Sequence, residues 1–188
     1  FLEVAVRGAG LGGGDLTGAL LNDADMTGCI AREAILEKAS LNGAKLDGSD
    51  LTGARCPHAI FTSVSLRSAN LAGADLSKAL FSKSDITQSN FSGAVLRSIL
   101  FAETKGEKVN FSGADMFNSR ILKDSEMAGS NFTNMKADKA CWIKADLSGC
   151  DLRGATMKKA LVQECSLAGA DLTGVRAREA RFTKTDLT

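Results

Sequence analysis

One histidine and five cysteines are the residues of this chain best suited to nucleophilic or metal chemistry. His58 follows Pro57, and a single histidine without a companion nucleophile forms no catalytic triad. No two cysteines have C-x-x-C spacing, so their arrangement disfavours a zinc site. The five are Cys29, Cys56, Cys141, Cys150 and Cys165. We expect the first two and the last two to be small buried core residues, and Cys141 to face outward.

Acidic residues and an N-terminal glycine run suggest two further kinds of chemistry. The chain has 22 Asp and Glu residues, which could act as acid–base pairs. Many of the Asp residues, however, are separated from one another by multiples of five residues and so belong to a structural pattern. Residues 8–13 match the phosphate-binding pattern G-x-G-x-x-G but lack its strand–turn–helix context. We therefore expect no enzymatic activity, no cofactor and no metal.

Length and composition indicate a single folded domain. The chain has 188 residues, of which 44% are apolar and 24% charged, with a formal net charge of +1. This apolar fraction is typical of globular proteins and disfavours disorder. There is no apolar run of about 18 residues, so we expect no membrane partner. The near-zero net charge disfavours a nucleic-acid partner.

A five-residue repeat runs along the chain. Stepping by five from Leu11 gives large apolar residues at nearly every position as far as Phe101, and stepping back reaches Phe1. The residue two before each apolar centre is small, the one between is often Asp or Asn, and Ser or Thr and then Gly often follow. A period of five fits neither a helix nor a continuous strand, but it fits a short extended segment and a turn. We expect the small residue and the centre to face inward and the residue between them to face outward.

The runs ANLAGADL at 69–76 and ADLTG at 170–174 resemble the A-(D/N)-L-x-x signature of pentapeptide-repeat proteins. The resemblance covers essentially the whole chain, as one domain over residues 1–188. It implies an all-β fold, the right-handed quadrilateral β-helix (a solenoid) of that family, with four units per coil and about nine coils.

Residues of the same type recur at intervals of twenty, as a four-unit coil requires. Three asparagines have this spacing and a fourth follows at twenty-one, so we expect an Asn ladder of Asn70, Asn90, Asn110 and Asn131. An aromatic column in the core is expected to contain Phe61, Phe81, Phe101, Trp142 and Phe182.

The repeat is disturbed at one place. Gly106 stands where an apolar centre is expected, and one extra residue shifts the frame near 122–126. Both changes fall on the same side of the coil, so we expect a bulge or a small loop there. Two interpretations remain open, a tolerated insertion or a raised feature that binds a partner.

One outward-facing column is apolar where the others usually carry Asp or Asn. Ile60, Leu80 and Leu100 are expected to stack about 4.8 Å apart on the surface. With neighbouring outward residues they make an apolar stripe of Leu20, Ile60, Leu80, Leu100, Leu122, Ile143 and Leu161. Exposed apolar patches commonly mark interfaces. We predict that this stripe contacts a protein partner or an adjacent domain of the same chain, with a homodimer as one form of such contact.

Two functions follow from the resemblance. The first is a non-catalytic interaction scaffold or adaptor module of a larger bacterial protein, since similar modules occur in bacterial effectors and secretion-associated proteins. The alternative is a DNA mimic that binds gyrase, a type II topoisomerase. DNA carries one negative charge per ~1.7 Å, whereas this chain balances 22 acidic against 23 basic residues, so its charge disfavours the alternative.

The ends of the chain suggest a piece of a longer protein. The sequence begins with Phe1 rather than Met, shows no signal peptide, and stops within a repeat unit. Unpaired cysteines are typical of a reducing compartment. We expect a location in the bacterial cytoplasm, with a secreted effector or secretion-associated protein as the alternative.

Overall fold

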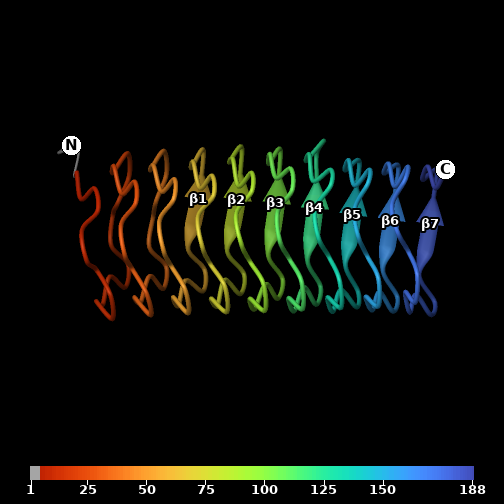
Figure 1. Cartoon of the computed structure of the whole chain (residues 1–188), viewed down its shortest axis with the longest axis horizontal. Coiled ribbons are helices and arrows are strands. Elements are labelled where there is room, and N and C mark those ends of the chain that lie inside the picture. The colour runs from red at the N-terminus through yellow and green to blue at the C-terminus, as the bar shows by residue number, and fades with distance from the viewer. Residues whose placement is uncertain (1–4) are drawn as a thin grey trace.

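The protein is a rod of stacked coils that follow one another along its long axis (Figure 1). The computed structural model describes residues 5–188, so Phe1, the first expected centre, lies outside the described residues. Parallel bridges join residues twenty positions apart in four columns, which begin with Ala5–Asp25, Gly10–Ile30, Asp15–Ile35 and Leu20–Ser40. Four columns at five-residue intervals make a four-sided coil, which confirms the quadrilateral β-helix.

Seven short strands form one parallel sheet along one side of the rod, here called the strand face (Figure 1). They are β1 (Ile60–Thr62), β2 (Leu80–Ser82), β3 (Leu100–Ala102), β4 (Arg120–Leu122), β5 (Cys141–Ile143), β6 (Leu161–Gln163) and β7 (Arg181–Thr183). Two N-terminal coils join the same column only through the single bridges Leu20–Ser40 and Ser40–Ile60. The strands are therefore slightly fewer than the coils expected.

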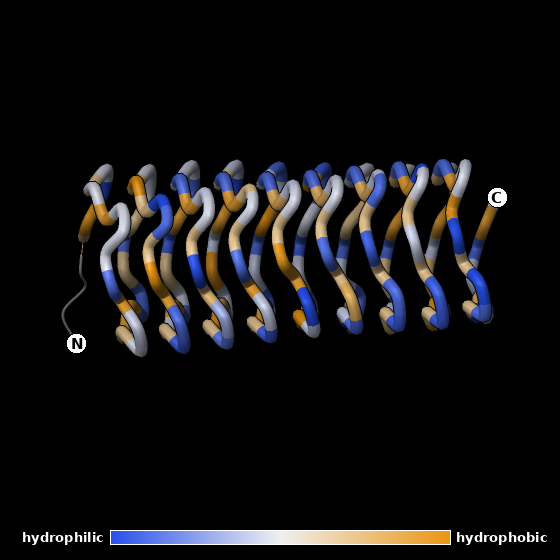
Figure 2. The backbone as a smooth tube through the Cα atoms, turned by 90° about the horizontal axis from the view of Figure 1, so that it is seen from below, coloured by the Kyte–Doolittle hydropathy of each residue, from blue (hydrophilic) through white to orange (hydrophobic). Residues whose placement is uncertain are grey.

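The interior is filled by the apolar centres and by the small residues two positions before them. Leu71, Ala74 and Leu76 have no exposed surface, whereas Asp75 between them is partly exposed. Hydrophobic and hydrophilic segments accordingly alternate around every coil (Figure 2). This alternation follows from the extended backbone, in which successive side chains point to opposite sides.

Aromatic rings stack in two columns inside the rod. In the predicted column, the ring centroids are 4.5 Å apart for Phe61 and Phe81 and 5.2 Å apart for Phe81 and Phe101. Trp142 is also buried. A second column, not identified from the sequence, consists of Phe91, Phe111 and Phe132, with spacings of 5.3 and 5.0 Å. The same twenty-residue interval, followed by the frame shift, could have revealed it.

Phe182 does not belong to the buried core. It pairs in register with Val162, as the column requires, but it is 36% exposed. Each coil of a solenoid is covered by the coils on its two sides, and no further described coil covers Phe182. The prediction that Phe182 is a core residue is therefore wrong.

The corners place the fifth residue of each unit in the left-handed region. Gly53 and Gly73 both have φ of 66°, and His58 and Lys78 adopt similar values of 60° and 59°. Glycine reaches this region without steric cost. The frequent glycine at this position is thus explained by the turn that closes each unit.

The extra residue changes the register from twenty to twenty-one. Lys105 pairs with Glu126, and Arg120 pairs with Cys141. At the corner between these pairs, the consecutive residues Lys123 and Asp124 have φ of 56° and 55°. The insertion is a one-residue bulge, and all four columns continue beyond it.

Candidate interaction surface

The central part of the apolar stripe lies on the outer surface of the strand face. Ile60 pairs in register with Leu80, and Leu80 with Leu100, so their side chains stack at the spacing of neighbouring strands, about 4.8 Å. Phe61 and Phe81, the next residues along their strands, point into the core. Ile60 is 38% exposed, and Leu80 and Leu100 are half-buried. These three residues form a continuous outward apolar row.

The structure does not join all seven residues of the stripe into one patch. Leu20 is 78% exposed but is separated from Ile60 by Ser40. Arg120 and Cys141 stand between Leu100 and Leu161 in the same column. Two further members, Leu122 and Ile143, are half-buried at the far end of their strands.

A shallow groove runs beside the stripe. Its volume is about 390 Å³, and its lining includes Leu80, Leu100, Lys78, Asn118 and Arg120. Leu80, Leu100 and Arg120 follow one another in the strand-face column, and Lys78 and Asn118 lie at the adjacent corner, so apolar and polar groups line the groove together. An apolar centre with a polar rim is typical of protein–protein interfaces.

The opposite face carries the Asn ladder. The side-chain N–H of Asn90 donates to the side-chain oxygen of Asn70 at 3.0 Å, and that of Asn110 donates to Asn90 at 3.1 Å. Asn131 pairs with Asn110 through the backbone, but among the described residues its side chain makes no hydrogen bond to Asn110. The side-chain ladder therefore links three residues rather than the four predicted.

The recurring Asp residues stabilise the corners of the coil. The Asp15 carboxylate accepts hydrogen bonds from the Thr17 hydroxyl at 2.6 Å and from the Thr17 backbone N–H at 3.0 Å. These bonds, the hydroxyl first, lower the pKa of Asp15. A hydrogen bond from Arg7 is the main cause that lowers the pKa of Asp25 to about 2. Such carboxylates stay ionised and are poorly suited to exchange protons near neutral pH.

The cysteines and the histidine are placed separately. Burial raises the pKa of the Cys56 and Cys150 thiols to about 12, so neither forms the reactive thiolate at neutral pH. Cys141 is half-buried on the strand face, and His58 is exposed at a corner. Within residues 5–188, no three His, Cys, Asp or Glu side chains are grouped so that they could hold a metal ion.

A charged hollow lies beside the one-residue bulge. Its volume is about 530 Å³, and its charged lining residues are Glu103, Lys105, Lys123, Asp124, Glu126 and Lys144. Lys123 lies 3.7 Å from Glu103, and the second pair, Lys144 and Glu164, is separated by 3.8 Å. Since three cations balance three anions in the lining, the hollow has no net preference for a charged ligand.

The comparisons with known proteins agree with this architecture. A family model described as "Pentapeptide repeat region" matches residues 34–111, and one described as "Pentapeptide repeats (8 copies)" matches residues 122–154, 130–167 and 150–188. No curated protein matches the sequence.

In the described part of the chain, no helix has the length and apolar character needed to cross a membrane.

The solved structure of QnrB1 has the same type of fold. QnrB1, a plasmid-mediated fluoroquinolone resistance protein, is 17% identical, with 93% of this chain and 91% of that chain covered and a TM-score of 0.58. HetL, a pentapeptide repeat protein involved in heterocyst differentiation regulation from the cyanobacterium Nostoc sp. strain PCC 7120, is 24% identical. Its alignment covers 95% of this chain and 87% of HetL, with a TM-score of 0.42. The likeness to QnrB1 establishes the fold alone.

Proposed function

Because the chain belongs to the pentapeptide-repeat family, we propose that it is a non-catalytic scaffold that binds a protein partner, or an adjacent domain of its own chain, through the apolar stripe. The observation that carries this proposal is the continuous row of Ile60, Leu80 and Leu100 on the outer surface of a parallel sheet. A row held by backbone pairing presents a rigid, flat binding surface, and such preorganisation lowers the entropic cost of association.

The repeat itself does not require leucine in this row. At the same slot of other units, Asp or Asn accepts a hydrogen bond from the backbone two residues later, as Asp75 does from Ser77 and Asn90 from Ser92. Leu80 and Leu100 have no polar atom to make this bond and leave apolar surface in contact with water. Their presence is better explained by a contact that covers them than by the fold.

We also propose that the protein works in a reducing compartment, as an adaptor module of a larger bacterial protein. All five cysteines are unpaired, which supports a reducing environment.

The charge distribution gives little support to DNA mimicry. Arg153 lies 2.6 Å from the carboxylate of Asp151 and 3.6 Å from that of Asp171, so these stacked acidic residues are partly neutralised. A DNA mimic would need a nearly continuous row of uncompensated negative charge.

The double variant Leu80→Asp/Leu100→Asp is expected to lose partner binding by about 100-fold or more, because buried anchor residues dominate the binding energy of an interface. The rod should remain folded, since Asp151 and Asp171 already stack as neighbours in the same slot of another face. Proteins captured from a lysate of the source organism are identified by mass spectrometry. Sedimentation measures any self-association, and circular dichroism measures the fold.

A matched control is Ile35→Asp/Val95→Asp, which makes the same change at the same slot of the neighbouring face. The control should capture the same proteins as the unmodified chain. Capture or self-association that is equal in all three proteins contradicts a binding role for the stripe.

A further inference from the structure

Positive charge is concentrated at one corner of the rod in its last three coils. The corner and the outward positions on either side of it comprise residues 136, 138, 139 and 141, and those twenty and forty further along. Seven of these twelve positions are Lys or Arg, and two are Asp or Glu. The seven cations, all exposed, are here called the basic edge and are Lys136, Lys139, Lys158, Lys159, Arg176, Arg178 and Arg181.

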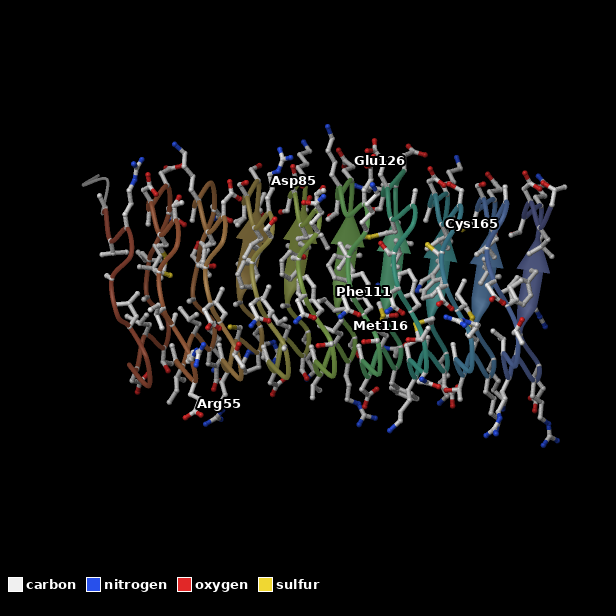
Figure 3. All side chains as sticks on the ribbon, viewed as in Figure 1. Arg55, Asp85, Phe111, Met116, Glu126 and Cys165 are labelled. Carbon is white, nitrogen blue, oxygen red and sulfur yellow. The ribbon has the colours of Figure 1, made fainter. Side chains whose placement is uncertain are left out.

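The net charge of the whole chain conceals this concentration. The twelve positions carry a net charge of +5, whereas the full chain carries +1, so all other residues together carry −4. Long side chains that end in nitrogen project beside the last coils, from the side of the rod opposite to Asp85 and Glu126 (Figure 3). The positive charge of the last coils is therefore concentrated on one side of the rod.

Most of these cations form no ion pair with an acidic side chain of the described residues. Glu179 lies 3.4 Å from Lys159 and 3.5 Å from Arg178. The second acidic residue, Asp138, accepts a hydrogen bond from the backbone N–H of Lys158 at 2.9 Å. The five remaining cations make no ion pair with any residue in the range 5–188, and they are Lys136, Lys139, Lys158, Arg176 and Arg181.

Like charges are stacked directly at this corner. The backbone N–H of Lys139 donates to the carbonyl of Lys158 at 2.8 Å, and that of Lys159 donates to Arg178 at 2.9 Å. Cations on adjacent coils are therefore held about 4.8 Å apart by the backbone, where they repel one another. The next corner offsets Lys123 with Glu103 on the neighbouring coil. At the basic edge one cation, Lys159, is offset in this way by Glu179 of the next coil, whereas the other stacked cations face a cation.

An outward aromatic ring extends the basic edge towards the N-terminus. Phe117 is half-buried, and the Arg97 guanidinium lies 5.1 Å from its ring centroid. The Lys139 ammonium lies 5.4 Å from the same centroid. Cation–π contacts of this kind hold the charged groups at the surface of the rod.

We propose that the basic edge binds the phosphodiester backbone of a nucleic acid that lies along the rod. A nucleic-acid strand carries one negative charge per ~3.4 Å, so a linear row of closely spaced cations is complementary to it. Protein interfaces, by contrast, are depleted of charge at their centre. The only large apolar side chain among the twelve positions is the half-buried Leu161. Binding through phosphates carries no sequence preference.

The test is a titration of the protein into fluorescently labelled single-stranded and duplex oligonucleotides, followed by anisotropy. We expect binding with a Kd in the micromolar range at about 50 mM salt, which weakens steeply towards about 200 mM. The variant Lys139→Gln/Lys158→Gln/Lys159→Gln should bind at least ~10-fold more weakly. Its plot of log affinity against log salt should lose about one unit of slope for each lysine removed. Glutamine suits these corners, since Gln88 has φ of 60°.

The control Lys83→Gln/Lys108→Gln/Lys144→Gln removes the same charge from three lysines elsewhere on the rod, all in the left-handed corner conformation that Lys139 and Lys159 also adopt. It should bind almost as tightly as the unmodified protein. Three results would overturn the proposal: no binding at low salt, equal losses in both variants, or equally tight binding of polyglutamate, which would indicate an acidic-protein site. None of them bears on the apolar stripe, because its three central leucine and isoleucine residues are unchanged in both variants.

Discussion

Replacing Phe81 by alanine is expected to lower the free energy of unfolding by about 3–5 kcal/mol, the usual cost of removing a fully buried aromatic side chain. The Phe81 ring lies between Phe61 at 4.5 Å and Phe101 at 5.2 Å, and its edge meets Phe91 at 6.2 Å. Its side chain has no exposed surface. The substitution therefore removes contacts with three neighbouring rings and leaves a cavity in the middle of the rod.

Urea unfolding followed by circular dichroism and by the fluorescence of Trp142 measures this loss. Solenoids are stabilised by contacts between neighbouring coils. A defect in a central coil can therefore make the unfolding midpoint from circular dichroism differ from the midpoint from Trp142 fluorescence. Phe182→Ala, in the same column but exposed, is the matched control and should cost less than about 1 kcal/mol. If Phe81→Ala costs no more than Phe182→Ala, the stacked aromatic core described here is incorrect.

Replacing Gly106 by leucine is expected to destabilise the protein by about 1–3 kcal/mol through overpacking, although the repeat pattern favours leucine at this position. A Cβ atom at Gly106 would lie 2.6 Å from the sulfur of Met127 and 3.1 Å from the Cγ1 atom of Ile86. These two side chains come from the coils on either side and occupy the space that a central leucine would fill. Gly106 is thus part of the packing around the bulge rather than an empty place in the core.

The double variant Gly106→Leu/Met127→Ala tests this explanation, because it shortens the side chain that blocks the new one. A double-mutant cycle in urea should show that the two substitutions are coupled, with the leucine tolerated better when Met127 is alanine. If Gly106→Leu alone raises the unfolding midpoint, the site contains a cavity and the packing described for this coil is wrong.

The sequence predicts the fold well because the same pattern of small, polar and large apolar residues recurs in nearly every unit. Alternation of Ala, Asp and Leu defines the inward and outward positions, and the twenty-residue spacing of Asn70, Asn90 and Asn110 indicates a four-sided coil. The burial of Phe182, but not its place in the column, was predicted wrongly, because a pattern of residue types does not show whether a coil is covered. The repeat pattern also does not predict the side-chain hydrogen bonds of Asn131, because it gives the backbone register alone.

The surface is less accessible to sequence analysis. The central residues of the apolar stripe could be selected because they depart from the Asp or Asn of their slot, but the interruptions by Arg120 and Cys141 reduce the stripe to a shorter row. The basic edge was missed because net charge sums over all sides of the rod. Only the arrangement of coils shows that Lys139 and Lys158 are neighbours, and that seven cations and two acidic residues share this edge.

The register of the coils is the claim on which every surface assignment depends. It can be measured with pairs of spin labels by double electron–electron resonance. Lys38→Cys is combined in turn with Lys139→Cys, Lys159→Cys or Glu179→Cys, which occupy the same corner five, six and seven coils further along. Cys141→Ser removes the one native cysteine that is not buried.

The register predicts Cα separations of about 24, 29 and 34 Å for the three pairs, an equal step of about 4.8 Å per coil. Distance distributions centred near these values, each measured across the one-residue bulge and rising in equal steps from one pair to the next, would agree with the four-sided rod. Distances that do not rise in equal steps would contradict the twenty-residue coil, and with it the positions of both the apolar stripe and the basic edge.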